Sequence, residues 1–165
     1  AAWLLLSKLL PYFLINQLQF IGMIALGRYV LPLFDVPAFT LQGPYWQYGL
    51  LSCAVSVSAL GYGLLVSVLA KSTEHAVVLG GGGIILMAAI GGIMVPSHVM
   101  PQAMQTMTQI SPMHWALKGF HDLLLNRYAF TQILHHVYLL LLFGLACLSM
   151  ATILYARQLK TQVRF

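Results

Sequence analysis

Four long apolar runs, separated by shorter polar segments, dominate the hydrophobic pattern of this chain. An α-helix needs roughly 20 apolar residues to cross about 30 Å of hydrocarbon, and each run reaches that length. We predict membrane-spanning helices at about residues 9–33, 45–70, 76–95 and 133–155. The expected fold class is therefore all-α: a polytopic integral membrane bundle that forms a single transmembrane domain over residues 1–165.

The composition agrees with a membrane environment and excludes two other classes of protein. Hydrophobic residues make up 60% of the 165 positions, charged residues only 7%, and the mean hydropathy is +0.86. Soluble domains carry about 25% charged residues, and disordered chains are polar and charged as well. The net charge of +5 comes mostly from scattered Lys and Arg residues. This pattern favours contact with anionic membrane lipids and indicates no nucleic-acid partner.

The stretch between the third and fourth runs, residues 96–132, has no span of its own. Ser111 followed by Pro112 is a favourable helix start, a capping residue with proline in the first turn. We predict short external helices that lie in the membrane interface or re-enter the bilayer. The segment is divided by three prolines, Pro96, Pro101 and Pro112.

The first run carries several polar residues, which are expensive on a helix that faces lipid. Asn16 shares one helical face with Gln19, Met23 and Gly27, because these follow it by three, seven and eleven residues. That face should look into protein or a water-filled cavity. Arg28 either extends to the headgroups or has an inward functional role, and both interpretations stay open. Asn16, Gln19 and Arg28 form the candidate translocation face.

Small residues in the second and third runs predict close helix packing. Small side chains let membrane helices bring their backbones together, and in the second run they form a stripe: Ser52, Ser56, Ala59, Gly63 and Ser67. The third run has four consecutive glycines, of which Gly80 and Gly83 are assigned to packing. No Gly-Lys-Ser/Thr follows them, so the pattern of a phosphate-binding loop is absent.

The histidines do not form a recognisable metal site. His114 and His121 are seven residues apart, about 10 Å along a helix, which is too far to share one metal ion. His135 and His136 open the last run, where we expect them at the membrane interface.

Enzyme chemistry is not indicated either. Asp35, Glu74 and Asp122 are expected in loops, so no pair of embedded carboxylates is predicted. The sequence also lacks GxSxG and HExxH motifs. We therefore predict that the chain is no enzyme, with no catalytic, cofactor-binding or metal-binding residue.

Lys and Arg residues predict the orientation in the membrane, because cytoplasmic loops are enriched in them. An even number of spans puts both ends of the chain on one side. The other side would hold Lys118 and Arg127, with Arg28 near its edge. We expect both ends in the cytoplasm, and we expect the membrane to be a bacterial cytoplasmic (inner) membrane. The side of the membrane that holds both chain ends would carry five basic residues: Lys8, Lys71, Arg157, Lys160 and Arg164.

Three segments in this order resemble the permease subunits of ABC (ATP-binding-cassette) type-2 exporters. The first is the entry into a span at Lys8–Tyr12, and the second is LGYGLLVSVLAKSTEHA at Leu60–Ala76. The third runs from the glycine-rich span through "Pro…Met-Pro…Ser-Pro", at Gly91–Leu125. The resemblance extends over Lys8–Tyr155.

The resemblance implies a six-span permease of which this chain is the C-terminal, four-span portion. It also implies a separate nucleotide-binding ATPase that carries ATP and Mg, so this chain itself would bind no cofactor. Lys71 and Glu74 are the candidate contact with that cassette. A second permease half would complete a homodimer or heterodimer. The external helices would form a gate with these candidate residues: Pro96, Met100, Pro101, Met104, Met107, Pro112 and Trp115.

The resemblance therefore predicts the permease component of an ATP-driven exporter that moves a substrate from the cytoplasm or inner leaflet outward. One alternative is a membrane anchor or scaffold that transports nothing, since no clear binding residue is visible. A secondary transporter ranks last, because charged residues within the spans are absent apart from Arg28.

Overall fold

The computed structural model describes residues 2–41, 43–96, 99–126 and 130–162, without the side chains of 2–6, 126, 130, 132 and 159–162. The described residues form helices and contain no strand, which confirms the all-α prediction. Four helices are long and apolar enough to cross a membrane. The elements are α1 (Ala2–Tyr29), η1 (Leu31–Phe34), α2 (Tyr45–Leu69), α3 (Thr73–Ile90), α4 (Gln102–Thr108), α5 (Pro112–His121), η3 (Asp122–Asn126) and α6 (Phe130–Gln162).

Two helix ends differ from the expected boundaries because of local backbone chemistry. Helix α1 ends at Tyr29, before the short 3₁₀ turn η1, and Asp35 closes that turn in the left-handed region with φ 57°. Helix α3 ends at Ile90 and not near residue 95. Gly92 has φ 82°, a conformation that L side chains rarely adopt, so the helix cannot continue through it.

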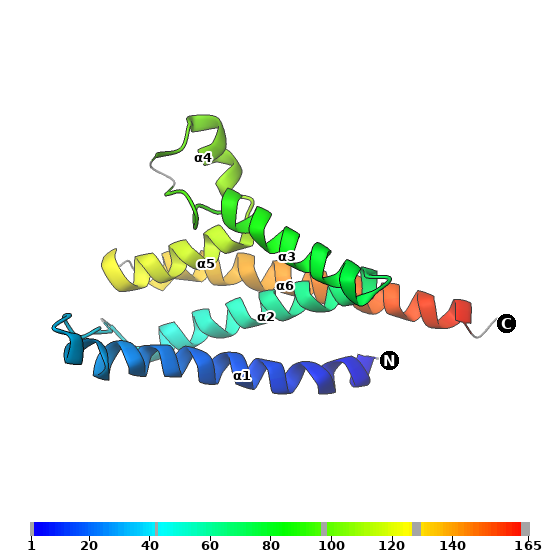
Figure 1. Cartoon of the computed structure of the whole chain (residues 1–165), viewed down its shortest axis with the longest axis horizontal. Helices are drawn as coiled ribbons and strands as arrows, with labels where there is room; N and C mark the ends of the chain where they lie inside the picture. The colour runs from blue at the N-terminus through cyan, green and yellow to red at the C-terminus, as the bar shows by residue number, and fades with distance from the viewer. Residues whose placement is uncertain (1, 42, 97–98, 127–129, 163–165) are drawn as a thin grey trace.

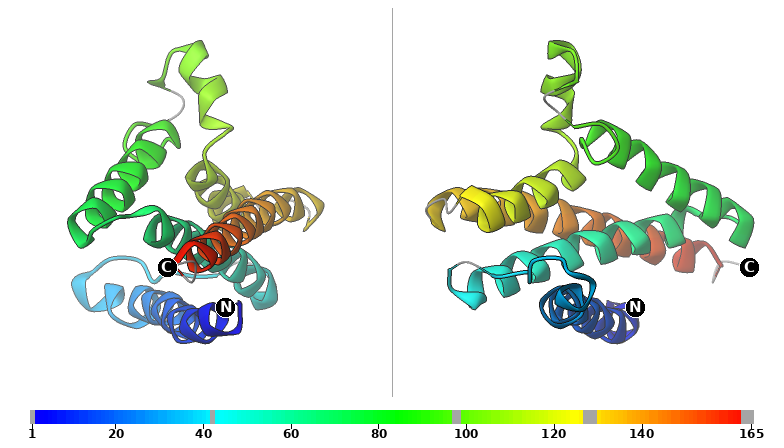
Figure 2. Two further views of the ribbon diagram at one scale, coloured as in Figure 1. Left: turned by 90° about the vertical axis from the view of Figure 1, so that its right-hand side faces the viewer. Right: turned by 60° about the vertical axis from the view of Figure 1, so that its left-hand side comes forward.

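Helices α2 and α6 pack along each other in the middle of the bundle (Figure 1). Helix α1 lies beside α2, and α5 lies beside α6. Helix α3 diverges from α2 and α6 toward its C-terminal end, which lies beside the start of α5, and α4 projects away from the bundle there (Figure 2). The start of α1, the α2–α3 turn and the end of α6 lie at one end of the molecule (Figure 1).

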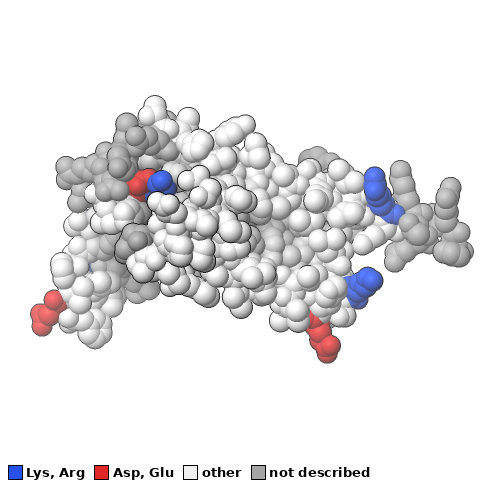
Figure 3. All heavy atoms as spheres, turned by 90° about the horizontal axis from the view of Figure 1, so that it is seen from above, with Lys and Arg blue, Asp and Glu red and all other residues white. Residues whose placement is uncertain are grey.

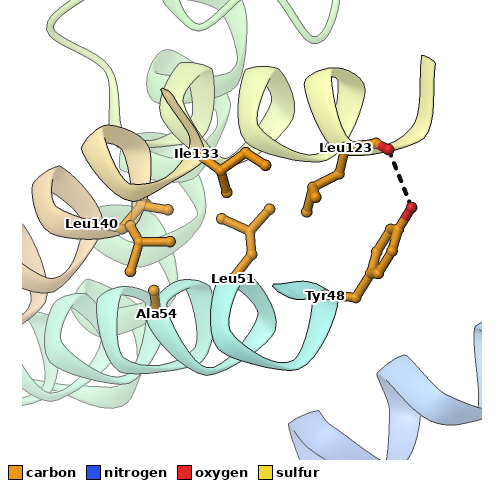
Figure 4. Packing of buried hydrophobic residues seen from close by; sticks show 7 residues of the cluster. Tyr48, Leu51, Ala54, Leu123, Ile133 and Leu140 are labelled. Carbon is orange, nitrogen blue, oxygen red and sulfur yellow. Dashed lines mark hydrogen bonds between the residues drawn. The ribbon is translucent and has the colours of Figure 1, made fainter. Parts of the chain in front are cut away.

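The core forms where α2, η3 and α6 meet (Figure 4). Leu51 of α2 and Leu140 of α6 are almost completely buried there. Tyr48 donates a hydrogen bond from its hydroxyl to the Leu123 carbonyl, at 3.1 Å. Lipid tails are as apolar as these side chains, so packing and hydrogen bonds hold the helices together more than exclusion of water does. The core side chains are Tyr48, Leu51, Ala54, Leu123, Ile133, Val137 and Leu140.

On one face of the molecule, a broad band contains no charged side chain among the residues that the structure describes (Figure 3). On the face shown in Figure 3, Lys, Arg, Asp and Glu lie toward the two ends, with uncharged residues between them. This distribution suits helices that cross a hydrocarbon layer. Of the residues used to predict the orientation, Arg127 and Arg164 lie outside the described residues, as does the side chain of Lys160.

Candidate functional site: the short helices α4 and α5 and their contacts with the spans

The N-terminal end of α5 is joined to the C-terminal end of α3. The Ser111 hydroxyl donates to the Met87 carbonyl at 2.8 Å, and His114 Nδ1 lies 3.3 Å from the Gly91 carbonyl oxygen. Ser111 occupies the N-cap position that the sequence predicts, but its side chain binds α3 and makes no cap hydrogen bond. A Cβ on Gly91 would lie 2.9 Å from Ser111 Oγ, so glycine is needed for this close approach.

Burial of the His114 ring lowers its pKa below the ordinary value near 6.5, because the imidazolium form loses hydration. The hydrogen bond with Gly91 opposes that shift, and the positive charge of Lys118 adds to it. The neutral ring is thereby favoured, and it can donate its Nδ1 proton to the Gly91 carbonyl.

Helix α4 is linked to α5 mainly through Trp115, whose indole N–H donates to the Gln109 carbonyl at 2.8 Å. Pro101 is the N-cap of α4, and Pro96 is exposed before it. Pro112 and Met107 both line a cavity of about 190 Å³ between the end of α3 and α4. Helix α4 and the start of α5 therefore border a partly open space next to α3.

The three predicted gate methionines differ in their surroundings. Met100 is 5% exposed, and its carbonyl accepts a 2.8 Å hydrogen bond from the Gln105 side chain. Met104 and Met107 are about half exposed. They therefore do not form one continuous lining with Met100 within this chain.

The C-terminal end of α5 is joined to α2 and α6. Here the expectation for Asp122 is wrong: it lies in the π-helical segment η3, not in a loop, and is 6% exposed. One of its carboxylate oxygens lies 3.6 Å from Nε2 of His136, which is likewise mostly buried and not at an open interface. The sequence does contain a signal for this burial, because Asp122 directly precedes three leucines.

Helix α1 contacts α2 through a residue that the sequence analysis left out of the candidate translocation face. The Gln17 amide donates to Ser56 Oγ at 2.8 Å, and Ser52 Oγ donates to the Gln17 carbonyl oxygen at 3.0 Å. Asn16 is half-buried, while Gln19 and Arg28 are exposed. The structure thus places Gln17, which is half-buried, against α2 and leaves Gln19 and Arg28 uncovered by this chain.

The small-residue stripe of α2 is divided in the structure. Ser52 and Ser56 are buried, as expected, but Ala59, Gly63 and Ser67 are exposed. A close backbone approach of α2 to α6 instead involves Gly61, which meets Gly144 of α6. Sequence reasoning missed Gly61 because it lies outside the stripe that contains Gly63, and it missed Gly144 because that glycine stands alone in an apolar run.

The third-span glycines lie near Tyr62 of α2. The Tyr62 hydroxyl donates to the Leu79 carbonyl at 3.1 Å and also lies within 3.4 Å of the Gly80 carbonyl. A Cβ on Gly83 would overlap that hydroxyl, whereas one on Gly80 would make only ordinary contact with Val66. Gly83 is therefore needed for packing at this point.

The turn between α2 and α3 presents the candidate cassette contact. Lys71 and Glu74 are both exposed, but the expectation that Glu74 lies in a loop is wrong, because Glu74 is in the first turn of α3. Ser72 caps α3, because its hydroxyl accepts a 3.2 Å hydrogen bond from the His75 backbone N–H. Lys71, Gly63 and Ser67 line an open pocket of about 500 Å³ between the two helices.

Four apolar helices, three of which contact the short helices α4 and α5 with η3, define a polytopic helical membrane protein. The chain belongs to the ABC-2 type transporter family, because the family model described as ABC-2 type transporter matches residues 1–125. It is therefore the transmembrane permease component of an ABC-type transporter, an integral membrane protein whose family works with an ABC ATPase component. No curated protein and no solved structure matches the chain.

Proposed function

We propose that this permease moves a substrate outward, from the cytoplasm or the inner leaflet, and that ATP hydrolysis on a separate cassette drives the movement. The supporting observation is the attachment of α5 at both ends. Ser111 and His114 tie it to α3, while η3 and Asp122 tie it to α2 and α6. A change in the tilt of any of these spans therefore acts on α5, which suits a gate on the outer side.

In this proposal the α2–α3 turn faces the cytoplasm and contacts the cassette through Lys71 and Glu74. Both side chains are exposed at the end of the bundle where α1 begins and α6 ends. ATP and Mg would be bound by the cassette and not by this chain. Both described ends of the chain would then lie on the cytoplasmic side of a bacterial inner membrane.

A second permease half, identical or different, would complete the pathway. Gln19 and Arg28 are exposed on α1, and half of the α2 stripe is exposed as well. Polar residues on an uncovered membrane helix favour a protein or water neighbour over lipid. We propose that Asn16, Gln19 and Arg28 line the substrate path once the two halves pair.

The experiment is to purify the full natural chain from its own membranes and to measure vanadate-sensitive ATPase activity. We expect an ATPase in stoichiometric amount, with activity that falls several-fold in Lys71→Gln and Glu74→Gln. Asp35→Asn is the matched control, because Asp35 is an exposed carboxylate at the other end of α1. A preparation with neither an ATPase nor activity would favour a scaffold and contradict the exporter proposal.

A further inference from the structure

A partly open cavity of about 160 Å³ lies between four helices, α2, α3, α5 and α6. Each helix contributes to its wall, through Ala59, Ile84, Met113 and Phe143 respectively. Ala59, Ile84 and Phe143 lie within three of the four apolar helices that are long enough to cross a membrane. The cavity therefore lies at the depth of the hydrocarbon layer.

Hydrogen bonds attach α3 to its neighbours on two sides of this cavity. The Tyr62 hydroxyl of α2 donates to the Leu79 carbonyl, and the Ser111 hydroxyl at the start of α5 donates to the Met87 carbonyl. Leu79 and Met87 are eight residues apart, which is about 12 Å along a helix. Between these two attachments α3 diverges from α2 and α6 (Figure 2), and the described side chains leave the cavity unfilled.

The wall of the cavity is chemically apolar. Among its lining residues, all of which the structure describes, only Ser58 and Tyr62 carry a polar side chain, and the Tyr62 hydroxyl already donates to α3. The other lining residues are alanine, proline, methionine, phenylalanine and branched aliphatic residues. None of these side chains is charged, so the wall offers no ionic partner for a phosphate, a carboxylate or a metal ion. The chemistry of the wall fits an uncharged, apolar ligand.

Neither ordered water nor an empty space suits this cavity. A buried water typically makes about three hydrogen bonds, and the two hydroxyls here do not supply them. An empty space would deprive the lining atoms of dispersion contacts. An engineered apolar cavity of about 150 Å³ stays dry and binds benzene or xenon. The volume and the wall together therefore suit a short stretch of hydrocarbon.

The cavity is continuous with a surface of α3 that lies open within the membrane. Ile84, on the cavity wall, is 45% exposed, and the next residues, Ile85 and Leu86, are exposed as well. With the exposed Val77 and Val78, these side chains are spread over more than half of the helix circumference, at about 100° per residue. One helix of a second permease half covers only part of such a surface, so lipid chains cover the rest and reach Ile84.

We propose that this cavity binds the hydrocarbon chain of a membrane lipid, which enters past Ile84 and lies between α3 and the α2–α6 pair. The bound chain holds α3 at its distance from α2 and α6 between the two hydrogen-bonded attachments. The site follows from the position of these helices in the membrane and not from the direction of transport, so it is independent of the proposed function.

The test is photolabelling by a phosphatidylcholine that carries a diazirine on one acyl chain. The full natural chain is placed in phosphatidylcholine nanodiscs with a small fraction of this probe, irradiated and digested, and labelled residues are identified by mass spectrometry. The readout is the ratio of labelling at Met113, on the cavity wall, to labelling at the exposed Val78. We expect Met113 to be labelled to an extent comparable with Val78. Labelling of Val78 without Met113 would overturn the proposal, and would show that a second permease half or nothing occupies the cavity.

Substitutions that fill the cavity separate a bound chain from chance contact. Ala59→Leu places a larger side chain in the cavity from an exposed position of α2, so the labelling ratio should fall several-fold. Ala146→Leu is the matched control, because Ala146 is exposed on α6 and does not line the cavity; here the ratio should not change. An unchanged ratio in Ala59→Leu, or an equal fall in both variants, would contradict a chain bound at this site.

Ile84→Phe provides a second filling variant from the opposite wall, in case Ala59→Leu is not monodisperse in gel filtration. It should lower the ratio in the same way, because the larger ring lies where the chain is proposed to enter. A parent preparation without ATPase activity would count against the exporter proposal alone, since the labelling ratio does not depend on that activity.

Discussion

Gly61 of α2 and Gly144 of α6 meet backbone to backbone at the crossing of the two central helices. A Cβ on Gly144 would lie 2.9 Å from Ser58 Cα, and one on Gly61 would lie 2.5 Å from the Gly144 carbonyl oxygen. Real Cβ atoms almost never come so close to backbone, so a side chain at either position must push the helices apart. The close crossing of α2 and α6 thus requires glycine, which has no Cβ, at both positions.

Gly61→Ala and Gly144→Ala should therefore each destabilise the protein by about 1–3 kcal/mol, the usual cost of overpacking. Gly63→Ala is the matched control, because nothing lies within 4 Å of its Cβ position. It should be neutral or stabilising, since alanine favours helix by about 1 kcal/mol over glycine. Thermal unfolding in detergent measures all three, and equal effects at Gly61 and Gly63 would refute the assigned crossing.

The contact between Gly83 and Tyr62 predicts a coupled pair of substitutions. Gly83→Ala should displace the Tyr62 hydroxyl from the Leu79 carbonyl and cost about 0.5–1.5 kcal/mol, the net value of a hydrogen bond. In a Tyr62→Phe background the same alanine should cost less, because no hydroxyl is left to displace. A double-mutant cycle measures this, with Gly82→Ala as the control because its Cβ position is open. Additive effects would contradict the contact.

The Gln17 contact predicts that the attachment of α1 depends on one amide. Gln17→Leu should lose the hydrogen bonds to Ser52 and Ser56 and destabilise the α1–α2 pair by about 0.6–2 kcal/mol. Gln19→Leu is the matched control, since Gln19 is exposed. The measurement is thermal stability in detergent. If Gln19→Leu proved the more destabilising of the two, the assigned helix rotation would be wrong.

The lowered pKa of His114 predicts a loss of stability in acid. An unfolded chain binds a proton at His114 below about pH 6.5, while the folded chain does so only at lower pH. Stability should therefore fall as the pH decreases below 6.5 toward the folded pKa. His114→Asn removes this contribution, so the difference in melting temperature between parent and variant should narrow from pH 7 to pH 5. A constant difference would show that the ring titrates normally.

The candidate site was predictable only where a signal lay within one segment. Ser111 and Pro112 indicate the start of α5, and the serines at 52 and 56 indicate a buried face of α2. No local pattern shows that Ser111 binds Met87, or that Gln17 and not Gln19 faces α2, because both depend on how helices are rotated against each other. The roles of Asn16, Gln19, Arg28, Lys71 and the gate residues remain predictions.

By itself the sequence determined the membrane environment, the four long helices and the ABC-2 family resemblance. These follow from hydropathy and motif order, which are properties of the chain read one segment at a time. Only the tertiary structure decided that Gly61 meets Gly144 and that Asp122 is buried against His136. Such contacts join residues far apart in the chain, and in lipid they depend on helix rotation and backbone distance, which hydropathy does not encode.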